Sequence, residues 1–169
     1  VLRLARALTE LGAQHEAAVR GFLLMRLQRA APQMEACDLA EGAAVLARAR
    51  LYCHELGCAV EALLSGNPWA FELRDLLKLL PHFRQWRLGP VQRKAFQSLG
   101  SRLAELAEQL SPRDALEAAE TFAAVGSAHE VLLQHCYLRL LLGRSFTALP
   151  AAGLARLAGG MAHVQHYHT

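Results

Sequence analysis

The chain has 169 residues, of which 53% are hydrophobic, and it carries a formal net charge of +3 at pH 7. This length suits a single domain with a substantial core. No uncharged apolar run approaches the roughly 18 residues that a membrane span needs, so we expect no membrane-spanning helix. The apolar content fits either an Ala- and Leu-rich helical protein or a protein whose apolar surface is partly covered by partners in an assembly.

Apolar residues recur at helical spacing along the chain, and no stretch alternates as a β-strand would. The predicted helices cover, in chain order, residues 1–11, 13–29, 38–57 (or 41–57), 59–64, 72–86, 91–109, 111–126, 131–142 and an incomplete one from 150. Breaks are predicted at Gly12, at Pro32 and, most strongly, at the turn Ser65-Gly66-Asn67-Pro68. Pro81 lies inside a predicted helix and should kink it or end it early.

The helical hairpin over residues 111–142 has the clearest local signals. Ser111 can cap the first helix, and Pro112 follows at the first helical position, where its missing N–H costs nothing. Asp114 stands three residues after the cap, as in a capping box. Gly126 should stop this helix, and the apolar run 131–142 supplies the second one.

The apolar positions of this hairpin recur at a spacing of 39 residues. Ala115, Ala118, Ala119 and Phe122 correspond to Leu76, Leu79, Leu80 and Phe83 one unit earlier, and to Leu154, Leu157, Ala158 and Met161 one unit later. Periods of this size are typical of solenoids, in which each unit buries its apolar face against its neighbours. We therefore predict an all-α fold: an α-solenoid of antiparallel helical hairpins with eight or nine helices. It would form one repeat domain over residues 1–169, with approximate units 1–37, 38–70, 71–110, 111–149 and 150–169.

Charge is concentrated in residues 74–102, where seven basic residues stand against one acid, a local net charge of +6. The following stretch, 103–130, has a net charge of −5. Bases at this density contact phosphates well, and an aromatic ring such as Trp86 or Phe83 can stack on a nucleobase. The predicted RNA-binding residues are Arg84, Trp86, Arg87, Arg93, Lys94 and Arg102. An acidic protein partner and a simply solvated basic face are the alternatives.

The sequence contains few signals of metal binding or catalysis. His163 and His166 lie one helical turn apart, but no further ligand is near them in sequence, so we predict no metal site. No phosphate-binding loop, nucleophile set or paired carboxylates are recognisable, so we predict no enzymatic activity, no cofactor and no small-molecule substrate. The four cysteines, at positions 37, 53, 58 and 136, should be reduced and mostly buried, with Cys58 at a turn after Gly57. Reduced thiols fit an intracellular or organelle-matrix setting.

The pattern Leu110-Ser-Pro-Arg-Asp-x-Leu116-x-x-Ala119-x-x-Phe122-Ala-x-x-Gly126, followed by Leu132-Leu133, resembles the heptatricopeptide-type helical repeats. These repeats occur in FASTK-like and RAP-domain proteins and are related to the octotricopeptide repeats of organelles. The resemblance is clear over 110–149, fair over 71–109 and 150–162, and weak before residue 65. It implies an α-solenoid that is imported into an organelle and binds RNA.

No RAP domain is visible, and only about four units are present, which favours a structural part of a larger particle. The sequence therefore predicts a non-catalytic RNA-binding protein of the mitochondrial matrix or another organelle. It would be a ribosomal protein that contacts rRNA and neighbouring proteins of a mitochondrial ribosome. A TPR-like scaffold that binds only protein is the alternative. The basic, acid-free segment Val1–Leu8 resembles part of a transit peptide, although its apolar spacing also fits a repeat helix.

Overall fold

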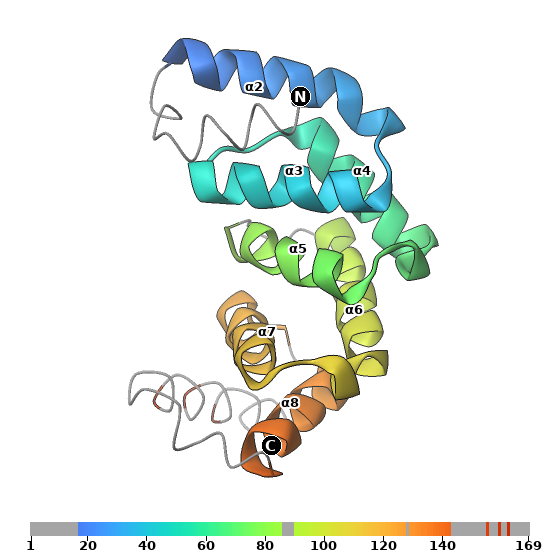
Figure 1. Ribbon diagram of the computed structural model, residues 1–169, viewed down its shortest axis with the longest axis vertical. Coiled ribbons are helices and arrows are strands. Elements are labelled where there is room, and N and C mark those ends of the chain that lie inside the picture. Colours follow the sequence, from blue (N-terminus) through green and yellow to red (C-terminus); the bar gives the residue numbers. More distant parts are fainter. Residues whose placement is uncertain are drawn as a thin grey trace. The chain divides into compact units, whose positions relative to one another are not determined.

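The computed structural model describes residues 17–85, 90–127 and 129–142, together with the single positions 155, 159 and 162. Over these residues the protein has seven α-helices, three short 3-10 helices and no strand, so the predicted all-α class is confirmed there (Figure 1). The α-helices are α2 (Ala17–Ala30), α3 (Ala36–Ala49), α4 (His54–Gly66), α5 (Leu73–Gln85), α6 (Pro90–Glu105), α7 (Pro112–Val125) and α8 (Glu130–Leu142). The chain divides into two compact units, Val1–Arg87 and Leu88–Thr169.

The first unit is built around α3, which packs against both α4 and α5 (Figure 1). Helix α2 ends at Ala30, and a 3-10 turn over Ala31–Gln33 leads into α3, as the predicted break at Pro32 requires. The buried apolar side chains of the three central helices follow helical spacing and include Leu39, Val45, Leu46, Leu56, Val60, Leu64, Leu76, Leu79, Leu80 and Phe83. Burying each side chain of this size contributes about 1.5–3 kcal/mol, so the packing of α3 against α4 and α5 stabilises the unit.

The prediction of one continuous helix up to Gly57 was wrong. Helix α3 ends at Ala49, and Arg50 adopts a left-handed conformation with φ 52°. Two backbone bonds close this end: Arg50 N–H donates to Ala47 O, and Leu51 N–H donates to Leu46 O at 2.9 Å. Leu51 is buried, and this burial offsets the cost of a left-handed non-glycine residue, about 1–3 kcal/mol. Gly57 consequently lies inside α4, a full second helix, and not at a turn.

Helix α5 also departs from one expectation. Pro81 lies inside it, and the helix continues to Gln85, so of the two predicted outcomes, a kink or an early end, the early end does not occur. Leu79, Leu80 and Phe83 are completely buried on either side of the proline. Their contact with the neighbouring helix outweighs the missing backbone hydrogen bond at Pro81.

The second unit contains α6, α7 and α8, with α8 packed against the other two. The rings of Phe96 from α6 and Phe122 from α7 stack with centroids 4.1 Å apart, and both are fully buried. At the start of α7, Ser111 Oγ accepts from Asp114 N–H while the Asp114 carboxylate accepts from Ser111 N–H, which confirms the predicted capping box. Gly126 ends the helix in the left-handed conformation, with φ 67°, as expected.

Several sequence predictions fall outside the described residues. These are the helix over 1–11 with its stop at Gly12, the helix from Pro150, and the predicted core positions Leu154, Leu157 and Met161. The predicted core positions in α5 and α7, from Leu76 to Phe122, are all buried.

Candidate nucleic-acid interface

Arg84 occupies the last turn of α5. The helix buries Leu76, Leu79 and Phe83, which places positions 84 and 85 on the outward face, and Arg84 is exposed. Trp86 and Arg87, the next two predicted contacts, lie outside the described residues. The first unit therefore presents one predicted RNA-binding base at the end of a helix.

Arg93 and Lys94 lie in the first turns of α6, and both are exposed. Their neighbours Ala95 and Phe96 are fully buried, so the two bases occupy the side of the helix that faces away from the core. The first turn of α6 contains no acidic residue, and its backbone N–H groups add a partial positive charge. These features suit contact with an anion.

Two other bases of the segment are paired with carboxylates of the protein. Lys78 Nζ lies 3.0 Å from Glu41 Oε2 and 3.7 Å from Asp75 Oδ1, and its side chain is only 28% exposed. Arg102 Nη1 donates to Glu105 Oε2 at 2.7 Å, and its side chain is 20% exposed. Because these charges are already paired and partly desolvated, they add little to the field outside the protein. Arg102 is thus a weaker candidate for an RNA contact than Arg84, Arg93 and Lys94.

Burial also decides which aromatic side chains are able to stack on a nucleobase. Phe83 is fully buried and packs in the core, so it cannot stack on a nucleobase. Burial lowers the pKa of His82 to about 3, so this side chain is neutral at pH 7 and adds no positive charge to the segment. Trp69, in the 3-10 turn Pro68–Ala70, is instead 64% exposed. Sequence reasoning missed Trp69, although the turn signal before it marks this segment as surface.

Arg93, Lys94 and Arg102 lie on one helix of the second unit, whereas Arg84 belongs to the first unit. The common rim predicted for Arg84, Trp86, Arg87, Arg93 and Lys94 stays a prediction.

Among the described residues, no three His, Cys, Asp or Glu side chains converge as a metal site would require. His163 and His166 lie outside them. None of the helices that the structure describes is long and apolar enough to cross a bilayer.

The cysteines differ from the expectation that most would be buried. Cys53 and Cys136 are buried, but Cys37 and Cys58 are exposed, and all four are free thiols. Cys58 lies beside His54 on α4, a pair that sequence reasoning did not single out. The spacing of four residues within one helix is the signal that could have found it.

Comparison of the chain with protein-family models, with curated proteins and with solved structures gives no match. The resemblance to heptatricopeptide-type repeats therefore stays a prediction from the sequence.

Proposed function

We propose that this chain is a non-catalytic helical-repeat protein that binds RNA through Arg84, Arg93 and Lys94, together with Trp86 and Arg87, which lie between them in the sequence. The observation that carries the proposal is the exposure and ion pairing of the basic side chains. Arg84, Arg93 and Lys94 are exposed and make no ion pair within the described residues, whereas Lys78 and Arg102 are paired with carboxylates. Exposed and unpaired bases are free to displace counterions from phosphates, which is the main source of affinity for nucleic acids.

The repeat architecture is part of the same proposal. The equivalent positions Leu76 and Ala115, and likewise Phe83 and Phe122, are fully buried in α5 and α7. Asp75 and Asp114 each stand in the first turn of their helices. This shared register supports a 39-residue helical repeat, and the sequence resemblance then favours a structural rRNA-binding protein of a mitochondrial ribosome.

The test replaces Arg84, Arg87, Arg93 and Lys94 with Ala in the full chain and measures affinity for a single-stranded RNA at several salt concentrations. Each phosphate contact contributes about 0.7 to the slope of log K against log salt, so the slope should fall by about 2–3. Far-ultraviolet circular dichroism should show unchanged helix content, because the bases that the structure describes are exposed.

The matched control removes the same charge from exposed arginines elsewhere, at Arg20, Arg26, Arg29 and Arg113. This control should keep the slope of the unmodified protein. An equal loss of slope in both variants, or no loss in either, would refute the assigned interface.

A protein-binding scaffold is the second candidate, and one observation favours it. Val131 and Leu138 of α8 are seven residues apart on one helical face and are 53% and 52% exposed. Two exposed apolar side chains two helical turns apart suit the anchoring residues that a partner helix contacts. If the scaffold function is the main one, replacing both residues with Ser should abolish co-sedimentation with ribosomal subunits, whereas the variant lacking the four bases should retain it.

A further inference from the structure

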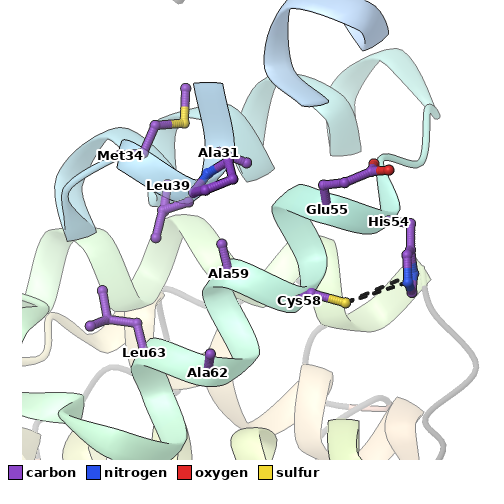
Figure 2. A pocket seen from close by; sticks show the side chains of 10 residues that line it. Ala31, Met34, Leu39, His54, Glu55, Cys58, Ala59, Ala62 and Leu63 are labelled. Carbon is purple, nitrogen blue, oxygen red and sulfur yellow. Dashed lines mark hydrogen bonds between the residues drawn. The ribbon is translucent and has the colours of Figure 1, made fainter. Parts of the chain in front are cut away.

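An open cavity with a volume of about 750 Å³ lies in the first unit, between α4 and the residues that lead from α2 into α3 (Figure 2). Two adjacent rows of α4 side chains line it, one at positions 54, 58 and 62 and the other at positions 55, 59 and 63. Ala31, Pro32 and Met34 line it from the segment between α2 and α3, and Leu39 lines it from the first turn of α3. Seven of the ten lining residues are apolar, and the volume falls in the range of about 300–1,000 Å³ that is typical of ligand sites.

A thiol and an imidazole stand together at this cavity. Cys58 Sγ lies 3.5 Å from His54 Nε2, and Tyr52 Oη lies 3.2 Å from His54 Nδ1 (Figure 2 shows the Cys58–His54 contact). In the tautomer with a proton on Nδ1, that N–H donates to Tyr52 and leaves Nε2 to accept the Cys58 proton. Nucleophile, base and orienting group are thus within reach of one another, an arrangement that activates a thiol.

The four cysteines differ sharply in their surroundings. Burial raises the pKa of Cys53 and raises that of Cys136 to about 12, so both remain protonated thiols at neutral pH. Cys37 is exposed, as Cys58 is, but it makes no side-chain hydrogen bond within the described residues. Only Cys58 combines access, a base and an adjacent apolar cavity in this part of the chain.

We propose that Cys58 is a site of S-acylation by a long-chain fatty acyl thioester, with the acyl chain held in the apolar cavity. The Cys58 sulfur attacks the thioester carbonyl as His54 Nε2 takes the thiol proton. A new sulfur–acyl bond forms, the old carbon–sulfur bond breaks, and the leaving thiolate receives the proton from His54. The exchange needs no oxidant or reductant.

The lining selects the chemical class of the reagent. Glu55 is held at the cavity by a hydrogen bond from Gln28 Nε2 to its Oε1, at 2.6 Å, and by one from the Cys53 thiol to its Oε2. Hydrogen bonds, chiefly from the backbone, lower the pKa of Glu55, so a carboxylate faces the cavity at neutral pH. A neutral acyl chain is compatible with the apolar part of this lining, whereas an anionic group seated in the cavity is repelled by Glu55, so the charged portion of an acyl-coenzyme A must remain outside it.

The first experiment incubates the full chain separately with acetyl-, octanoyl- and palmitoyl-coenzyme A and locates the adducts by peptide mass spectrometry. We expect Cys58 to react faster than Cys37, by a ratio that rises with chain length, up to about fourfold for each methylene group that enters the cavity. Equal rates at the two cysteines, or a ratio independent of chain length, would overturn the proposal. Faster modification of Cys58 by glutathione disulfide than by palmitoyl-coenzyme A would overturn the assigned class.

The second experiment separates the base from the cavity. His54→Gln should slow acylation at Cys58 by about 100-fold and leave Cys37 unchanged, since a positioned general base contributes at least this factor. Ala62→Phe should fill the cavity and remove the chain-length dependence, while small iodoacetamide still modifies Cys58. Ala62 is exposed, so this variant should fold, and Ala124→Phe on exposed α7 surface serves as its control. If the Ala62→Phe protein keeps the chain-length dependence, the cavity does not hold the acyl chain.

Discussion

Acidification should destabilise the first unit through His82. This side chain is 1% exposed, and burial lowers its pKa from the ordinary value of 6.5 to about 3. Between these two values the unfolded chain binds a proton at this residue that the folded chain does not bind. The stability that neutral His82 contributes is therefore fully present above about pH 6.5 and is lost as the pH falls toward 3.

The expected size follows from the shift. One pKa unit corresponds to about 1.4 kcal/mol, so bringing the protein from pH 7 to about pH 4 should remove about 3 kcal/mol at this residue. This is a large part of the stability of a typical domain, about 5–15 kcal/mol. The loss should approach about 5 kcal/mol below pH 3.

The assay compares urea unfolding of the unmodified protein and of His82→Leu at a series of pH values, followed by circular dichroism. Other groups titrate equally in both proteins, so the difference between their free energies of unfolding isolates His82. That difference should change by about 3 kcal/mol between pH 7 and pH 4 in favour of the variant. If it stays constant over this range, the folded protein accommodates a charged His82 and the reasoning is wrong. His82→Gln supplies the same comparison if the Leu variant does not fold.

Three further predictions concern the second unit and are measured as free energies of unfolding in urea. Phe122→Ala should cost about 3–5 kcal/mol, because the ring is fully buried and stacks on Phe96, and a cost below 1 kcal/mol would contradict the packing. Ser111→Ala should cost about 0.5–2 kcal/mol by removing the cap of α7, whereas Ser111→Thr should retain most of the stability. Gly100→Ala places a Cβ only 2.6 Å from His129 Cδ2 and 2.9 Å from Phe122 Cζ, so it should destabilise by about 1–3 kcal/mol, and a His129→Ala background should recover only part of that cost because the contact with the buried Phe122 ring remains.

Local signals in the sequence determined several elements of the fold. The capping box at Ser111, the left-handed stop at Gly126 and the break at Pro32 each depend on a few adjacent residues. Helical spacing likewise identified the buried face that includes Leu76 and Phe122. These features could be predicted because backbone bonding and side-chain direction act within one or two helical turns.

The tertiary structure decided which charges and thiols are available for function. Lys78 is paired with Glu41, 37 positions earlier in the chain, so counting charges along the sequence overestimated its contribution to the basic segment. The stop at Arg50 depends on the burial of Leu51, and the position of Cys58 inside α4 follows from that stop. These outcomes depend on desolvation and on contacts between separate helices, and no local pattern of residues records either one.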